Sequence, residues 1–466
     1  MFNTYIKANS NEIITEHYVG SCATYHGFAY QTFAEEMGLV GDVREREFER
    51  VRQMKLKLAR TWYRPDFSRD MFKRFCLWLD EMKKANVDVM LSASWFFTKD
   101  VWFFSHENHN DPDYTSKLEN FDKCCDKMAS WIAKSLESFI VVRGYTNIKY
   151  LSLFTEPFSY ASGPCPDGID YFEAYERCCR KINEKLIKFE VRDKVKLVGP
   201  NGIFTSHSDD QLIRAIEKMD DIIDIYSMHT YAWCDPAWQK NRGFYMTGYE
   251  GWKSHAEYIR KIAERTGKPI WFDEYGLSGD GKLAEGVRDS VWYGNYIGLI
   301  NAALINGGMN STLIWTLFDQ KYPYNITNSD SFYNGVQRWG CCKMPGDSIN
   351  DNENARPSWY VISLLSRYMS NGDAKVVKCE FGEGICSAVT VTADGRTSVL
   401  AVNMRDDSAN ITIDVDAQGL KRYLYDPAAL KPSPDYIMIE SDKKFDTSPI
   451  NDVLPPYAVA IYSNVD

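Results

Sequence analysis

The segment VKLVGPNGIFTSHSDDQLIRAIEKMDDIIDIYSMHTY, residues 195 to 231, carries the pattern that decides the fold. It begins with a short apolar run, VKLVGPNG (195–202), and ends with another, DIYSMHTY (224–231). Between these runs, residues 209 to 219 place apolar side chains at helical spacing. Two buried strands joined by an amphipathic helix are typical of a parallel βαβ unit.

This unit recurs along most of the chain. We expect strands at 17–24, 56–63, 87–94, 148–156, 195–202, 224–231, 269–276 and 311–319. We expect helices at 119–139, 170–189, 209–219, 253–265 and 288–305, with others near 45, around Leu79 and after Pro357. Eight such units predict a (β/α)8 barrel over residues 16–371, with its active site at the carboxyl ends of the strands.

A different pattern begins after residues 371 and 372. Short alternating runs are separated by turns, and Asp394-Gly395 is a typical hairpin turn. We therefore predict a small antiparallel β-sandwich over residues 372–466, with residues 3–15 as a candidate additional strand.

The composition argues against several classes of partner. The 466-residue chain has 54 Lys and Arg against 64 Asp and Glu, a net charge of −10. Such a chain is a poor partner for a phosphate backbone or an anionic membrane, so we expect binding to neither nucleic acid nor membrane. Aromatic residues make up 14% of the chain, and flat rings stack on the apolar faces of sugars. The composition favours a carbohydrate substrate and leaves the oligomeric state open.

The amino terminus and the cysteines indicate a cytoplasmic protein. Residues 1–17 lack the basic segment and the apolar run of a signal peptide. The 12 Cys are scattered or adjacent, and no C-x-x-C spacing suggests a zinc site. The seven His also lack the spacing of a metal-dependent barrel hydrolase. We therefore expect reduced thiols, no metal and no cofactor.

Two of the expected strands end in glutamate. LSLFTEP places Glu156 at the end of the fourth strand, and WFDEYG places Glu274 at the end of the seventh. A carboxylate that directly follows apolar residues is hard to explain by packing. Cleavage of a glycosidic bond needs one carboxyl group to protonate the leaving oxygen and a second to attack or support the anomeric carbon. The two glutamates therefore predict a glycosidase site.

These motifs resemble those of the retaining glycoside hydrolases of clan A. In that clan the fourth strand usually ends in Asn-Glu-Pro and the seventh commonly reads Glu-Phe or Glu-Tyr-Gly; here they read TEP (155–157) and EYG (274–276). The resemblance covers nearly the whole chain and is greatest to family 39 and the related families 5, 30 and 51. It implies that Glu156 is the acid/base and that Glu274 is the nucleophile.

Four further residues match the clan. Arg60 corresponds to an arginine of the second strand that keeps the nucleophile ionised. His229 and Tyr231 match a His-x-Tyr pair on the sixth strand, whose phenol hydrogen-bonds the nucleophile. Trp315 resembles the tryptophan of the eighth strand that forms a floor beneath the sugar, although a core tryptophan would fit the same pattern.

Thr155 departs from the clan pattern. The clan's asparagine at this place donates to the sugar 2-hydroxyl, and the shorter threonine cannot reproduce that geometry. Long loops rich in aromatic residues follow the third, sixth and eighth strands, and of their rings we select Trp95 and Trp233 for sugar contact. Such loops can wall a closed pocket, which favours exo action on oligosaccharides or small glycosides.

We therefore expect a retaining glycoside hydrolase that cleaves β-glycosidic, or equivalent α-L, bonds by a double displacement. Two alternatives stay open. A transglycosylase would use the same covalent intermediate, and a non-catalytic barrel would bind sugar without cleaving it. The sequence does not distinguish glucosides, xylosides, galactosides and arabinofuranosides.

Overall fold

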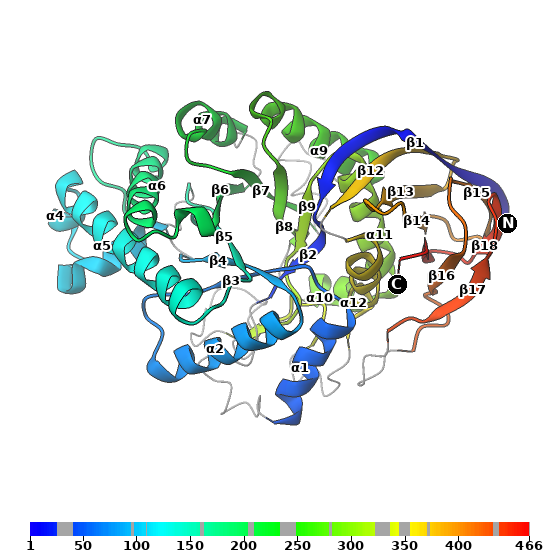
Figure 1. Cartoon of the computed structure of the whole chain (residues 1–466), viewed down its shortest axis with the longest axis horizontal. Helices are drawn as coiled ribbons and strands as arrows, with labels where there is room; N and C mark the ends of the chain where they lie inside the picture. Colours follow the sequence, from blue (N-terminus) through cyan, green and yellow to red (C-terminus); the bar gives the residue numbers. More distant parts are fainter. Residues whose placement is uncertain are drawn as a thin grey trace. The chain divides into compact units, whose positions relative to one another are not determined.

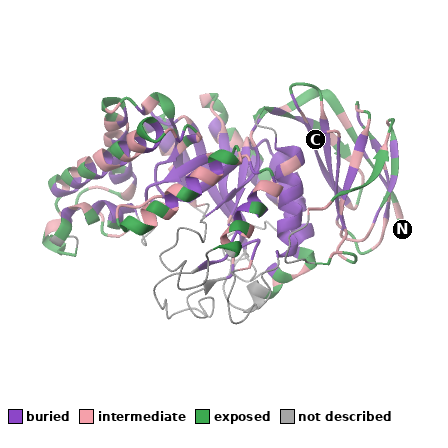
Figure 2. Cartoon of the chain, turned by 60° about the horizontal axis from the view of Figure 1, so that its bottom comes forward, coloured by how far each residue is buried: buried purple, intermediate pink, exposed green. Residues whose placement is uncertain are grey.

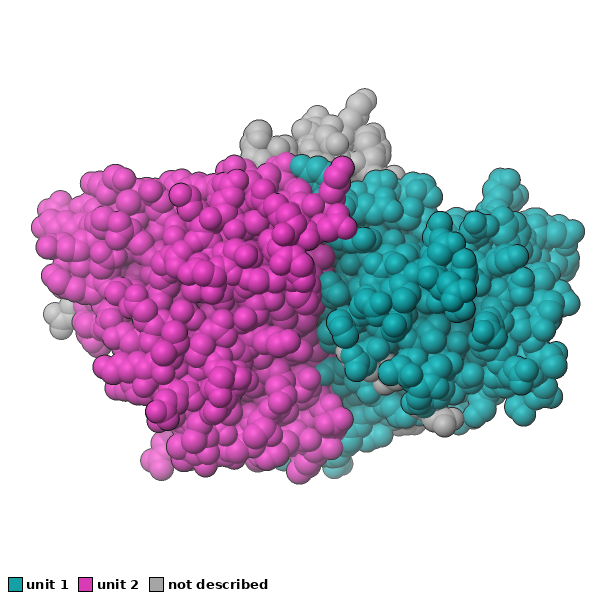
Figure 3. Space-filling view, turned by 45° about the horizontal axis from the view of Figure 1, so that its top comes forward, with its two compact units in different colours: residues 1–57, 231–260, 274–466 teal, residues 58–230, 261–273 magenta. Residues whose placement is uncertain are grey.

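The computed structural model describes residues 1–25, 41–94, 97–108, 110–158, 163–203, 209–233, 248–278, 282–321, 336–343, 355–370, 373–431 and 438–465. The chain divides into two compact units, shown in teal and magenta in Figure 3. Unit 1 comprises residues 1–57, 231–260 and 274–466, and unit 2 comprises residues 58–230 and 261–273.

Eight strands close into a barrel in the order in which they follow one another along the chain. They are β2 (Gly20–Thr24), β3 (Leu58–Trp62), β4 (Asp88–Ser92), β5 (Ile148–Ser152), β6 (Lys196–Ile203), β7 (Ile225–Trp233), β8 (Ile270–Ser278) and β9 (Ser311–Ile314). Paired strands run parallel, as where Arg60 of β3 lies opposite Met90 of β4. The expected (β/α)8 barrel is confirmed. Two of its strands continue from unit 2 into unit 1, β7 at Tyr231 and β8 at Glu274.

In unit 2, helices pack outside strands β3 to β7 (Figure 1). They are α2 (Arg69–Lys84), α5 (Leu118–Leu136), α6 (Tyr171–Lys188) and α7 (Asp209–Met219), with short helical turns at Glu137–Val142, Arg192–Lys194 and Glu264–Thr266. Each of the four buries one apolar face, and its outer face is exposed (Figure 2). The start of α6 is fixed by a capping box, because Asp170 accepts from the Glu173 backbone while the Glu173 side chain accepts from that of Asp170.

The segment after the third barrel strand differs from expectation. The sequence predicts a long loop over residues 96–116, but the chain there forms α3 (Phe97–Trp102), a 3-10 helix (Phe103–Asn108) and α4 (Pro112–Thr115). Burial of Phe97, Val101 and Trp102 stabilises α3. Asp111 caps α4, and Pro112 occupies its first turn. Buried apolar side chains therefore order a segment that was expected to be a long loop rich in aromatic residues.

Two helices of unit 1 are buried over most of their length, Val291–Asn306 apart from its first two residues and Pro357–Leu364 throughout. The helices are α1 (Asp42–Gln53), α9 (Tyr249–Ala263), α10 (Lys282–Asp289), α11 (Val291–Asn306) and α12 (Pro357–Leu364), followed by a π-helical turn at Leu365–Met369. Helix α11 packs against strands β13 (Ile385–Val391) and β14 (Thr397–Asn403). A side chain at Gly298 would lie only 2.9 Å from Val459, so glycine is needed there for the close approach.

The carboxyl-terminal residues and one amino-terminal strand form a nine-stranded sheet in unit 1, in the order β17-β16-β19-β14-β13-β12-β1-β15-β18. Besides β13 and β14, its strands are β1 (Phe2–Tyr18), β12 (Ala374–Phe381), β15 (Ala409–Asp414), β16 (Leu420–Tyr425), β17 (Ser441–Phe445), β18 (Ile450–Leu454) and β19 (Val459–Ser463). Strand β1 pairs antiparallel with β12 and parallel with β15. Apolar side chains from both halves of the sheet enclose one core, which includes Ile6, Val399 and Ile411. A β-sandwich follows the barrel, as expected.

Three strands of this sheet were not expected from the sequence: β16, β17 and β18. Strand β17 is nearly all exposed and carries Lys443 and Lys444. Its sequence therefore lacks the alternation of apolar and polar residues by which strands are predicted. The expected boundary at residues 371 and 372 falls outside the described part of the chain. A short two-stranded sheet, β10 (Gln320–Lys321) with β11 (Val336–Gln337), follows the last barrel strand.

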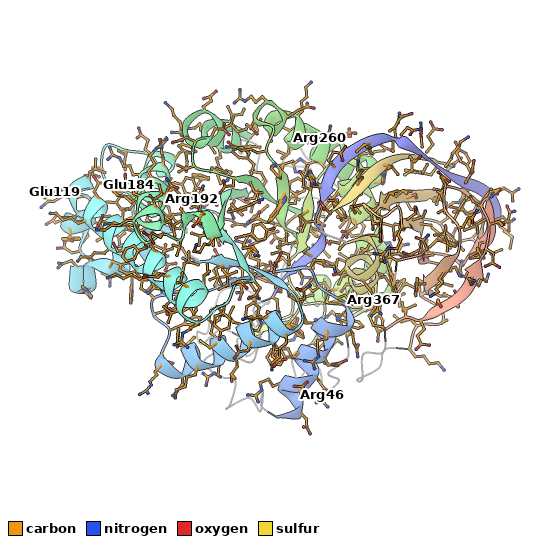
Figure 4. All side chains as sticks on the ribbon, in the orientation of Figure 1. Arg46, Glu119, Glu184, Arg192, Arg260 and Arg367 are labelled. Carbon is orange, nitrogen blue, oxygen red and sulfur yellow. The ribbon has the colours of Figure 1, made fainter. Side chains whose placement is uncertain are left out.

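Charged side chains cover the outer helices, as Glu119 on α5 and Glu184 on α6 illustrate (Figure 4). Among the helices of the described ranges, none is long and apolar enough to cross a membrane.

Candidate active site

Several residues of the candidate site lie in unit 2, and most of them contact the side chain of Arg60. Its side chain is fully buried at the middle of β3, and its guanidinium lies 5.0 Å from the centre of the Trp62 ring. Nη2 donates to the Thr155 hydroxyl at 3.0 Å, and Nη1 donates to the Asp273 carbonyl at 3.3 Å. The Asp273 carboxylate lies 3.7 Å from Nη1. A buried cation is costly unless it is paired, and Asp273 provides that pairing.

Asp273 is itself held by a hydrogen-bonded group that sequence reasoning missed. Its Oδ2 accepts from Asn201 Nδ2 at 2.7 Å. The same amide nitrogen donates to Ser152 Oγ at 2.8 Å, and Ser227 Oγ donates to Asn201 Oδ1 at 2.9 Å. All four side chains are buried. The available signal was the presence of polar residues in segments expected to be buried strands, because buried polar groups need hydrogen-bond partners.

His229 connects Arg60 to the first glutamate. The imidazole is fully buried on β7, with Nδ1 2.9 Å from Glu156 Oε1 and Nε2 3.4 Å from Arg60 Nη1. A guanidinium can only donate hydrogen bonds, whereas the Asp273 carboxylate, whose Oδ1 lies 3.6 Å from Nε2, can only accept them. Nε2 therefore faces one donor and one acceptor, and Nδ1 faces Glu156.

Glu156 stands on a turn rather than on the strand itself. Strand β5 ends at Ser152, and Glu156 has a φ of 44°, in the left-handed region that non-glycine residues seldom adopt. Its backbone N–H donates to the Asn201 carbonyl at 3.1 Å, which fixes this conformation. The side chain remains 31% exposed, and its Oε1 is held by His229. Unusual backbone of this kind is concentrated at functional sites.

Thr155 points toward the arginine. Its hydroxyl oxygen accepts from Arg60 and also from Trp62 Nε1 at 3.1 Å, and it lies 3.3 Å from Ser92 Oγ. Because two donors use both lone pairs of this oxygen, only its own proton is left to donate.

Unit 1 contains the second glutamate. Glu274 is buried, with 3% of its surface exposed, and its Oε2 accepts from the Tyr231 hydroxyl at 2.6 Å. This is the contact that the clan resemblance implies for the nucleophile. A Cβ atom at Gly276 would lie 3.3 Å from the Trp315 carbonyl oxygen, so there is little space for a side chain at this position.

Trp315 is half-buried, and its ring lies 6.0 Å from that of Trp339 at an angle of 56°. Both rings belong to unit 1. Trp95 lies outside the described residues, as do most aromatic residues of the loop after β9. Trp233 ends strand β7, but its side chain is also outside them. The selection of these two tryptophans and the closed pocket stay predictions.

The ring nitrogens of His229 are both engaged in hydrogen bonds, Nδ1 with Glu156 and Nε2 with Arg60. Binding a metal ion requires a free lone pair on one of them. A metal ion bound to Nε2 would have to displace the arginine from its hydrogen bond.

Solved structures share this fold over nearly their whole length. The catalytic domain of GH30 xylanase C from Talaromyces cellulolyticus matches with a TM-score of 0.64 and 12% identity, over 98% of this chain and 99% of that one. The GH51 arabinofuranosidase from Xanthomonas axonopodis pv. citri gives 0.65 and 12%, over 99% and 100%. The chain has the fold of these glycoside hydrolases.

An endo-β-1,6-glucanase also matches, with a TM-score of 0.62 and 12% identity over 99% of this chain and 94% of that one. No family model and no curated protein matches the chain by sequence. At this identity the likeness establishes the fold, and the activity must be argued from the site.

Proposed function

We propose that the protein is a retaining glycoside hydrolase in which Glu156 is the acid/base and Glu274 is the nucleophile. It acts on β-glycosidic bonds, or on the equivalent α-L bonds, of oligosaccharides or small glycosides. We propose exo action and a cytoplasmic location as part of the same hypothesis.

One observation carries this proposal. His229 and Tyr231 are two residues apart on β7, and each hydrogen-bonds one of the two glutamates, Glu156 at 2.9 Å and Glu274 at 2.6 Å. The partners differ in chemistry. A phenol donor stabilises a carboxylate that must stay ionised, whereas the Glu156 side chain is 31% exposed, so that solvent can deliver a proton to its carboxyl group.

These roles account for both steps of the reaction. In the first step a Glu274 oxygen bonds to the anomeric carbon, the bond from that carbon to the leaving oxygen breaks, and the Glu156 proton passes to the leaving oxygen. In the second step Glu156 removes a proton from water, the water oxygen bonds to the anomeric carbon, and the ester bond to Glu274 breaks. Two inversions at one carbon give overall retention.

The sugar is not assigned by the fold, because the xylanase, the arabinofuranosidase and the glucanase all share it. These neighbours support a carbohydrate substrate, and the glucanase is by name an endo-acting enzyme. Exo action therefore depends on the long aromatic loops of the sequence.

A panel of nitrophenyl glycosides, followed by proton NMR of the first-formed product, tests the proposal. Release of a sugar with retained configuration is expected, with no change on adding a chelator. Inverted product would contradict the nucleophile assignment. Products larger than the substrate would indicate a transglycosylase, and sugar binding without turnover would indicate a non-catalytic barrel.

A further inference from the structure

The chain has a buried set of hydrogen bonds behind the acid/base that the reaction scheme does not use. It runs from Asn201 through Asp273 to Arg60, and from Arg60 to His229. All four side chains are buried and lie in unit 2. Four buried polar side chains are costly unless they are paired, so their connection to Glu156 calls for a physical explanation.

The two nitrogens of His229 face different groups. Nδ1 faces Glu156 Oε1 at 2.9 Å, while Nε2 faces both Arg60 Nη1 at 3.4 Å and Asp273 Oδ1 at 3.6 Å. A proton on Nε2 would point toward the Asp273 carboxylate but against the guanidinium. A proton on Nδ1 satisfies the arginine and Glu156 together.

Asp273 decides this competition through its other contacts. Its Oδ2 is held by Asn201 at 2.7 Å, and its backbone carbonyl accepts from Arg60 Nη1 at 3.3 Å. In the described part of the chain, Oδ1 receives no hydrogen bond. Asp273 thus fixes the arginine nitrogen that meets Nε2, while its own free oxygen stays beyond hydrogen-bond distance of the imidazole.

We propose that Asp273 and Arg60 hold His229 in the neutral form with its proton on Nδ1. Oε1 of Glu156 is then always a hydrogen-bond acceptor, and Oε2 is the oxygen that carries the transferable proton. Asp273 and Asn201 are positioning residues, because they act on Glu156 through Arg60 and His229. This inference rests on the proposed role of Glu156 as acid/base.

Two substitutions of the histidine separate its nitrogens. The amide nitrogen of His229→Asn occupies the position of Nδ1 and can still donate to Glu156, whereas that of His229→Gln occupies the position of Nε2 and cannot. We compare kcat/KM for an alkyl glycoside, which needs the acid, with that for the dinitrophenyl glycoside of the same sugar, which does not. For His229→Gln we expect about a 10- to 100-fold loss with the alkyl substrate and less than about a 3-fold loss with the dinitrophenyl substrate. His229→Asn should lose clearly less with the alkyl substrate.

The control is His255→Asn, which removes a buried histidine of α9 that has no place in this site. It should leave the ratio of the two kcat/KM values unchanged. Equal losses on both substrates for His229→Gln, or equal behaviour of Gln and Asn, would overturn the inference. Glu156→Ala is run beside them, because failure of that variant to discriminate between the substrates would contradict the acid role itself.

A second measurement does not depend on activity. Long-range proton–nitrogen NMR of the histidine-labelled protein distinguishes the two neutral forms and the cation, and the His229→Asn spectrum identifies the signal. We expect Nδ1–H at neutral pH in the wild type and the appearance of Nε2–H in Arg60→Met, which removes the donor that faces Nε2 and leaves the Asp273 carboxylate as acceptor. An Nε2–H or cationic His229 in the wild type would refute the proposal, whatever the enzyme cleaves.

Discussion

Tyr231→Phe tests the environment of the nucleophile with the smallest possible change. The substitution keeps the ring and removes only the hydroxyl that donates to Glu274 Oε2 at 2.6 Å. Glu274 is buried, so water replaces the lost donor poorly. The ionised carboxylate loses a hydrogen bond, whereas the protonated carboxyl group loses much less.

The size of the effect follows from the charge of the acceptor. A hydrogen bond to an ionised group contributes about 1.5 to 3 kcal/mol, which corresponds to about 1 to 2 pH units. The acid limb of the profile of kcat/KM against pH should move to higher pH by this amount. Activity on the acid side should therefore fall about 10- to 150-fold. At the plateau the loss should be smaller, because Glu274 gives up its negative charge as it bonds to the sugar.

The assay is hydrolysis of the best nitrophenyl glycoside from about pH 4 to about pH 9. Tyr226→Phe is the matched control, because Tyr226 lies on the same strand and its hydroxyl donates to a different carboxylate, Asp220, at 2.7 Å. The control should leave the acid limb in place. If Tyr231→Phe lowers kcat/KM equally at all pH values, or leaves the limb where it was, the hydrogen bond does not govern ionisation of the nucleophile.

Other parts of the chain give further expectations. Glu274→Ala should abolish turnover, and added azide should restore activity and give a glycosyl azide of inverted configuration. Glu156→Ala, given a dinitrophenyl glycoside and azide, should form a glycosyl azide of retained configuration. The opposite configurations would reverse the assigned roles. Arg356→Met breaks a fully buried ion pair with Asp319 and should lower the free energy of unfolding in urea by about 3 to 5 kcal/mol. Arg396→Met breaks an exposed pair and should lower it by less than about 1 kcal/mol. Equal losses would contradict the argument from burial. Burial lowers the pKa of His255 to about 3, below its unfolded value, so the unfolded chain binds the extra proton and stability falls as pH drops below about 6.5. Between about pH 6.5 and about pH 4.5 the wild type should lose about 2.3 kcal/mol more than His255→Gln, and an equal loss would show that this histidine is not buried as a neutral group.

The strand pattern predicted the barrel well because burial on both faces of a parallel strand leaves a clear apolar run. Its errors concern the ends of strands. The run at 148–156 predicts a strand up to Glu156, but β5 ends at Ser152. The residues after Ser152 form a turn in which Glu156 adopts a left-handed backbone conformation. A hydrogen bond from the Glu156 N–H to the Asn201 carbonyl of the next strand holds this conformation. Apolar composition does not record where a chain must turn.

The two glutamates could be predicted because a carboxylate after an apolar strand is conspicuous. Asp273 stands directly before one of them and was overlooked, since nothing in WFDEYG distinguishes which acid reacts and which supports. Asn201 was overlooked for a related reason. Its partners Ser152 and Ser227 lie 49 and 26 residues away, on neighbouring strands, so only the closed barrel reveals that the three belong together.

Thr155 shows how a substitution within a motif can change a role rather than merely weaken it. The sequence suggests that a threonine fails to reach the sugar where the clan's asparagine would. In the structure its hydroxyl accepts from Arg60 and from Trp62, which leaves it no lone pair. Thr155 therefore accepts a hydrogen bond from the arginine whose other terminal nitrogen lies next to His229 Nε2. Loss of this acceptor in Thr155→Val should act on Arg60 first, because the guanidinium then loses one of its partners.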